Sequence, residues 1–128
     1  MGFREIWVSD WESFLAEFNR SHRAWLTTVE RTDRAGTRVE ARARSLDAVE
    51  GESAAGRVVA IVITLDSDAE HPAALRVEAP VRISVDETVE GQVRGVEIED
   101  AQGTRTRLTF RTAPPLEALD GIAPGEVG

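Results

Sequence analysis

Two periodicities meet in residues 9–30, which read SDWESFLAEFNRSHRAWLTTVE. In the first part, aromatic and apolar residues recur every three or four positions, which is the spacing of one face of an α-helix. These residues are Trp11, Phe14, Leu15, Phe18 and His22. From Trp25 onward the period changes to two, as is typical of a β-strand. The stretch therefore predicts a helix over about residues 10–22 followed at once by strands, and hence an α+β domain.

The start of this helix has its own signal. Ser9 and Glu12 form a Ser-x-x-Glu capping box, in which each side chain accepts a hydrogen bond from the backbone of the other residue. The pattern predicts a helix that begins near Asp10. Its aromatic residues favour packing against a sheet over formation of a ligand cage, because helical aromatic stripes usually belong to the core.

The rest of the chain predicts strands within residues 24–112. Turn residues at 32–36 join the strand that starts at Trp25 to a second strand around residues 39–43, and Gly103 lies in the turn of a later hairpin over residues 96–110. A long alternation over residues 75–85 contains Pro80, so this strand lies at an edge or bends there. Residues 45–56 are interpreted as a loop. We expect a twisted antiparallel sheet of about six strands, either open or curled toward a barrel.

The stretch Arg57–Leu65 is apolar on both of its faces, which is typical of a strand that is covered on both sides. One helix covers only one face. The other face requires barrel closure, the C-terminal segment, or a second copy of the chain. The branched residues Val59, Ile61 and Ile63 favour a homodimer.

Composition excludes several classes of protein. The 128 residues suit a single domain over residues 1–128 with a Pro/Gly-rich tail at 113–128, and no apolar run is long enough to span a bilayer. No secretion signal is visible, so we expect a cytoplasmic protein. With no cysteine there is no thiolate chemistry. All 15 basic residues are arginine, and the net charge of −8 disfavours nucleic acid and anionic membranes.

Candidate catalytic groups are few. Ser53 lies in a Gly-rich stretch and is followed by Asp66, Asp68 and His71, the chain order of an α/β-hydrolase triad. A nucleophile elbow requires a strand before the serine and a helix after it, whereas a strand follows Gly56, so convergence of these groups is not expected. Phosphate-loop and calcium-loop patterns fail at required positions, and two histidines are too few for a typical zinc site. We therefore assign no catalytic, cofactor or metal residue, and interpret His22 as structural.

One positive pattern involves arginines on two strands. Those predicted to share a face are Arg38, Arg42 and Arg44 on one strand, and Arg105, Arg107 and Arg111 on the other. Together they would form an anion-binding patch. The competing interpretation is cross-strand pairing with glutamates, since Glu97 and Glu99 precede the Gly103 turn and Arg105 and Arg107 follow it.

The residues described so far also carry a family resemblance. They are Trp11, Phe14-Leu15, Phe18, His22, Trp25-Leu26, His71, Pro80, the Gly103 turn, Leu108-Thr109-Phe110-Arg111 and Asp120-Gly121-Ile122. In these positions the chain resembles a small bacterial family, domain of unknown function 5335. The resemblance implies a single bacterial domain and adds no catalytic residue.

The sequence favours a non-catalytic binding or protein-interaction module. Its partner would be another protein or a second copy of this chain. The alternatives are a small-molecule or anion-binding domain and a hydrolase that uses Ser53. The feature that separates them is a pocket in which polar groups converge.

Overall fold

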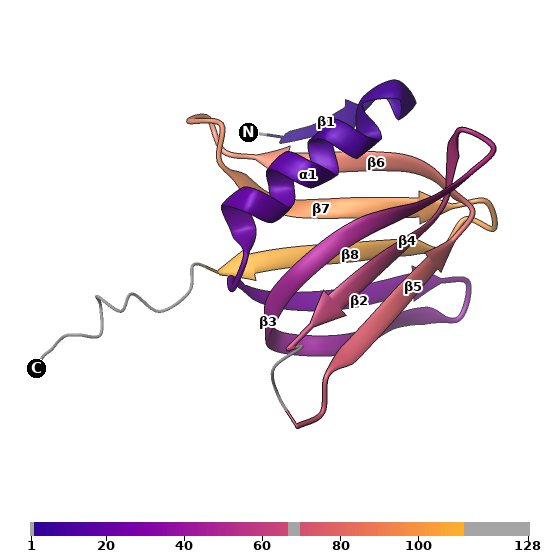
Figure 1. Ribbon diagram of the computed structural model, residues 1–128. Helices are drawn as coiled ribbons and strands as arrows, with labels where there is room; N and C mark the ends of the chain where they lie inside the picture. The colour runs from indigo at the N-terminus through magenta and orange to yellow at the C-terminus, as the bar shows by residue number, and fades with distance from the viewer. Residues whose placement is uncertain (1, 67–69, 112–128) are drawn as a thin grey trace, which may run out of the picture.

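The computed structural model describes residues 2–66 and 70–111 (Figure 1). The elements in chain order are β1 (Gly2–Ile6), the 3-10 helix η1 (Val8–Asp10), α1 (Trp11–His22), β2 (Leu26–Asp33), β3 (Gly36–Ala54), β4 (Arg57–Leu65), β5 (Ala73–Glu78), β6 (Pro80–Glu87), β7 (Val93–Asp100) and β8 (Arg105–Arg111). The α+β class and the antiparallel sheet are confirmed. The sheet has eight strands instead of about six. The predicted tail at 113–128 lies outside the described residues.

The two additional strands have identifiable origins. β1 is short, and its alternation of Phe3, Arg4, Glu5 and Ile6 is too brief to stand out. The predicted strand over residues 75–85 is divided into β5 and β6, because Ala79 has a positive φ of 50° and Pro80 begins a new strand. The predicted bend at Pro80 is therefore confirmed, and it transfers the chain from one half of the sheet to the other.

The strand order is β1-β6-β7-β8-β2-β3-β4-β5, with antiparallel pairing throughout. The sheet coils so that β3, β4 and β5 cross in front of the other strands (Figure 1). The terminal strands β1 and β5 do not pair with each other, so the barrel is not closed. At the corner between β5 and β6, the Ala101 N–H donates to the carbonyl of Ala79 at 2.9 Å and joins the two halves.

The predicted loop over residues 45–56 is wrong, because β3 continues through it to Ala54. The first part of β3 pairs with β2 as far as Ser45, and the second part pairs with β4 from Leu46 onward. Register shifts and a positive φ of 52° at Ala43 bend the strand between these parts. Such bulges interrupt the alternation on which a strand prediction depends, so the sequence of a bent strand resembles that of a loop.

Helix α1 packs its aromatic face into the core, as the sequence predicts. Trp11, Leu15, Phe18 and His22 are buried, and Phe14 is half-buried. The predicted capping box is wrong. Ser9 lies inside η1, Asp10 is the residue before α1, and no side chain caps the helix. The Glu12 carboxylate instead accepts a hydrogen bond from the Ser53 hydroxyl at 3.0 Å.

The two faces of β4 are covered to different extents within one chain. Ile61 and Ile63 are fully buried in the core. On the outer face, Arg76 of β5 reaches across β4 to Glu52 of β3 at 2.7 Å. The registers place Glu52 opposite Ala60, whose side chain is 0% exposed. Long charged side chains thus cover part of the outer apolar surface with their stems. Of the residues that favoured a homodimer, Ile61 and Ile63 are buried and Val59 is half-buried.

Candidate functional site

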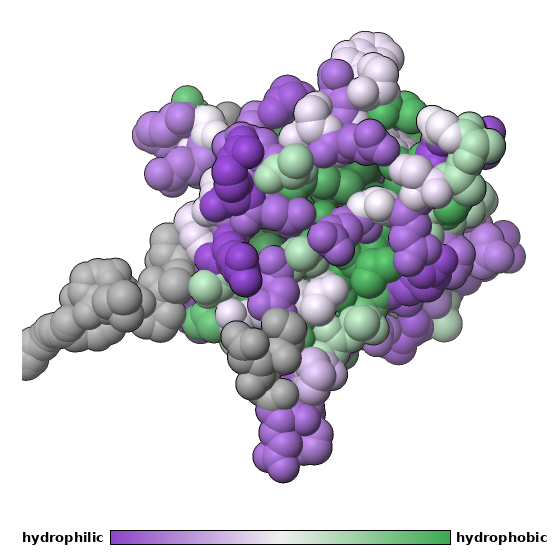
Figure 2. Space-filling view, in the orientation of Figure 1, coloured by the Kyte–Doolittle hydropathy of each residue, from purple (hydrophilic) through white to green (hydrophobic). Residues whose placement is uncertain are grey.

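A groove between α1 and β3 is the first candidate site. It has a volume of about 570 Å³. Its apolar lining consists of Leu15, Ala16, Val49 and Val62. Figure 2 shows hydrophobic surface at the centre of the molecular face, in the area where α1, β3 and β4 lie in Figure 1, with hydrophilic side chains around it.

The groove exists because β3 loses a strand neighbour at Ser45. Beyond that point α1 replaces the neighbour. The Asn19 amide accepts from the Val49 N–H at 2.7 Å and donates to the Val49 carbonyl at 3.0 Å, so one side chain satisfies both backbone groups. Farther along, Ser53 binds Glu12. Gly51 lies between these two anchors and lines the groove.

The rim of the groove is acidic. Glu12, Glu50 and Glu52 all line it. Arg76 neutralises Glu52 and holds the pKa of that carboxyl below its usual range through a hydrogen bond. Within residues 2–66 and 70–111, Glu12 and Glu50 form no ion pair. The groove therefore presents two uncompensated carboxylates beside an apolar floor.

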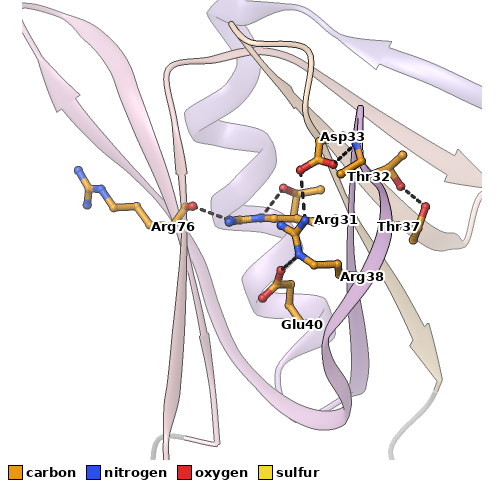
Figure 3. A network of polar contacts seen from close by, with 9 residues as sticks. Arg31, Thr32, Asp33, Thr37, Arg38, Glu40 and Arg76 are labelled. Atoms are coloured by element: carbon orange, nitrogen blue, oxygen red, sulfur yellow. Dashed lines mark hydrogen bonds and ion pairs between the residues drawn. The ribbon is translucent and has the colours of Figure 1, made fainter.

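A second candidate lies at the open end of the sheet, between the β2–β3 and β7–β8 hairpins and β5. This pocket, which we call the arginine mouth, has a volume of about 370 Å³ and is lined by Arg31, Arg38 and Arg76 together with Asp33, Asp100 and Gln102. Figure 3 shows Arg31 directed from β2 toward the backbone of Arg76. Its guanidinium donates to the Thr106 hydroxyl at 3.2 Å and to the Arg76 carbonyl.

The six arginines predicted to form one patch are divided between faces. Arg38 is opposite Arg31, and Arg31 is opposite Thr106. Because opposite residues share a face and successive residues alternate, Arg105 and Arg107 point to the other side of the sheet from Arg38. Strand β2 also separates the two sets.

Most of these arginines form ion pairs with carboxylates of the same chain. Arg38 binds Asp33 at 3.2 Å and Glu40 at 3.3 Å, and Arg44 binds Asp66 at 2.7 Å. Arg105 and Arg107 lie 3.9 Å and 3.8 Å from Glu97. The predicted pairing across the β7–β8 hairpin is confirmed by its register, which is Glu97 opposite Arg107 and Glu99 opposite Arg105. Arg42 and Arg111 are exposed, with no ion pair in the described ranges.

The hydrolase-like order of Ser53, Asp66 and His71 does not bring these residues together. Ser53 pairs with Val58 near the start of β4, whereas Asp66 follows the end of that strand. At about 3.3 Å per residue, the nine-residue strand separates them by more than 20 Å. Asp66 instead binds Arg44 and the Ser45 N–H. Asp68 lies outside the described residues.

His22 has the structural role that the sequence predicts. Its ring stacks on Phe18 with centroids 4.4 Å apart and lies 4.5 Å from Trp25 and 5.3 Å from Phe110. Its Nδ1 is 3.2 Å from the Phe18 carbonyl oxygen. Burial lowers the pKa of His22, opposed by backbone hydrogen bonds with Phe18 and Val93. The imidazole thus lies in the core, where burial disfavours its charged form.

Two further findings concern metals and membranes. In the part of the chain that the structure describes, no three His, Asp or Glu side chains gather where they could hold a metal ion. Nor does that part contain a helix whose length and apolar character would let it cross a membrane.

Sequence reasoning missed Asn19, Glu12 and Glu50 as groove residues, and missed Arg31. Asn19 offered a weak signal, because a residue with low helix propensity in mid-helix often has a side-chain partner. Arg31 offered no such signal in the sequence. Its partner Arg76 on β5 is far along the chain, and the contact between them depends on the coiling of the sheet.

Fold and site together define a small α+β protein, whose described residues form one α-helix on a coiled antiparallel sheet with both candidate sites open to solvent. The chain belongs to a family of unknown function, DUF5335, whose model matches residues 3–119. This confirms the resemblance at the level of the family, and the matched range ends before Asp120-Gly121-Ile122. No curated protein and no solved structure matches the chain.

Proposed function

We propose that this protein is a non-catalytic interaction module that binds an extended cationic segment of a partner protein in the α1–β3 groove. The observation that carries the proposal is the pairing of an apolar floor with the two uncompensated carboxylates of Glu12 and Glu50. A cationic partner with interspersed apolar side chains complements both features. A cytoplasmic location, to which the cysteine-free composition is suited, is part of this proposal.

The rigidity of the groove supports this function. Both of its walls are fixed, since Asn19 anchors α1 to Val49 and the Glu12–Ser53 contact anchors the first turn of the helix. A preformed groove binds with little ordering cost. The separation of Ser53 from His71 supports binding over hydrolysis.

The test uses a fluorescein-labelled peptide of alternating valine and arginine, with fluorescence anisotropy as the readout. We expect saturable binding that weakens several-fold in the double variant Glu12→Gln/Glu50→Gln, since exposed ion pairs contribute about 0.2–1 kcal/mol each. The matched control Glu70→Gln/Glu90→Gln changes the net charge equally at exposed positions outside the groove and leaves binding unchanged.

A steric variant separates the groove from general electrostatic attraction. Ala16→Trp fills the groove without altering charge, so we expect it to abolish binding. Equal weakening in both double variants, or full binding by Ala16→Trp, would contradict the proposal. A peptide with glutamate in place of arginine should not bind.

A further inference from the structure

We propose that the arginine mouth binds a small oxyanion, a carboxylate or a phosphate, through the guanidinium of Arg31. This site is separate from the α1–β3 groove and does not depend on the function proposed for it. Arg31 is half-buried, and both of its hydrogen-bond partners, the Thr106 hydroxyl and the Arg76 carbonyl, are neutral. Thr106 itself is only 1% exposed, so its hydroxyl holds Nε of the Arg31 guanidinium at the bottom of the mouth.

Two of the carboxylates that line the mouth, those of Asp33 and Glu78, are paired with the other two arginines. Asp33 binds Arg38 at 3.2 Å. On the other side of the mouth, Glu78 binds the guanidinium of Arg76. Arg38 also binds Glu40, and Arg76 also binds Glu52, so each of these two arginines is shared by two carboxylates.

The Asp100 carboxylate also has hydrogen-bond partners within the chain. Its Oδ1 accepts the N–H groups of Gln102 at 2.9 Å and Thr104 at 3.0 Å, and so shapes the β7–β8 turn. Among the described residues, Arg31 alone of the three arginines that line the mouth has no carboxylate within ion-pair distance. A partly desolvated cation without a counter-ion attracts an anion more strongly than an exposed one.

The chemistry of the guanidinium defines the ligand class. Arg31 has five N–H groups, and its two observed contacts leave the others available. A planar fork of N–H donors matches the paired oxygens of carboxylate and phosphate groups. The volume of about 370 Å³ is in the range of small-molecule sites and accommodates a small organic acid or phosphate ester.

The experiment is a titration of the full chain with succinate and, separately, with inorganic phosphate, at constant ionic strength. The readout is the set of ¹H–¹⁵N shifts of the Arg31 side chain and of the backbone amides of Gln102 and Thr104. We expect saturable shifts confined to the mouth, and the stronger of the two titrants identifies the oxyanion. Arg31→Gln should weaken binding at least tenfold, while Arg23→Gln, at the end of α1, leaves it unchanged.

A second pair of variants covers the case in which Arg31→Gln disturbs folding. Ala101 is exposed and lines the mouth, so Ala101→Glu supplies an internal carboxylate that competes with the ligand. We expect this variant to lose binding and Ala101→Gln, which has the same size without the charge, to keep it. Linear shifts without saturation, or equal binding by Ala101→Glu and Ala101→Gln, would overturn the proposal.

Discussion

Asn19 shows how one side chain substitutes for a strand. Antiparallel neighbours satisfy backbone N–H and C=O groups in pairs, and the amide of asparagine carries the same donor and acceptor. Placed on α1 beside the unpaired part of β3, it binds both groups of Val49. The helix can therefore lie along a strand edge without leaving that edge unsatisfied.

We expect Asn19→Ala to lower the free energy of unfolding by about 1–3 kcal/mol, because it leaves two partly buried backbone groups of Val49 without partners. Urea denaturation measures the change. Ser13→Ala removes an exposed hydrogen bond to the Asp10 carbonyl on the same helix and should have little effect. Equal midpoints for Asn19→Ala and the wild type would show that water replaces the amide without loss.

His22 gives the fold a pH dependence. Its pKa is lowered in the folded state by burial. As pH falls below about 6.5, the unfolded chain therefore takes up a proton that the folded chain resists. Stability is fully present above this pH and declines below it. We expect His22→Gln to flatten the decline in thermal melting temperature between pH 7 and pH 5, and a slope equal to that of the wild type would contradict this expectation.

At the scale of elements, the local sequence pattern predicts the helix and the unbulged strands but not a strand that a bulge interrupts. The helix, the β2–β3 and β7–β8 hairpins and the bend at Pro80 each follow from residues that are close in sequence. The part of β3 beyond Ser45 could not be predicted in this way, because a bulge shifts the alternation and places Glu50 and Glu52 on a solvent face. Helix propensity and strand period describe neighbours along the chain, and the groove arises from contacts between α1 and a strand about 30 residues later.

The same limit applies to the arginine mouth. Arg31 and Arg38 are paired by a short turn, which the sequence predicts. The approach of Arg31 to Arg76 requires the complete coil of the sheet from β2 through β3 and β4 to β5. The predicted six-arginine patch assumed that two strands were adjacent, and β2 lies between them.

The burial of the helix predicts an ordering of two aromatic truncations. Phe18 is 3% exposed and contacts Phe14, His22 and Phe110, whereas Phe14 is half-buried at the edge of the cluster. We expect Phe18→Ala to cost about 3–5 kcal/mol in chemical denaturation, and Phe14→Ala to cost clearly less. The reverse order would mean that α1 docks through its first turns and not through its centre.

At the scale of the whole molecule, coiling decides how the apolar surface is covered. Ile61 and Ile63 face the interior of the coil, and the Arg76–Glu52 pair lies over the outer face of β4. The chain therefore buries the inner face of its most apolar strand and covers part of the outer face, where Val62 lines the α1–β3 groove. This weakens the physical argument for a dimer through β4.

We accordingly expect a mass near 14.0 kDa in light scattering across a micromolar dilution series. Self-association would have to use another surface, such as the side chains of Phe3, Trp7 and Val8, which are 56%, 76% and 63% exposed. A concentration-dependent mass that Trp7→Ser returns to 14.0 kDa would contradict the expected monomer and locate the contact.

The length of β3 determines whether the two halves of the sheet are independent of each other. One strand of 19 residues forms the last partner of β2 and the first partner of β4, so the border between the two halves of the sheet runs through a continuous element and not through a linker. A recombination event at Ser45 would deprive both products of a hydrogen-bonded neighbour. We therefore expect that neither half of the sheet folds as a separate unit.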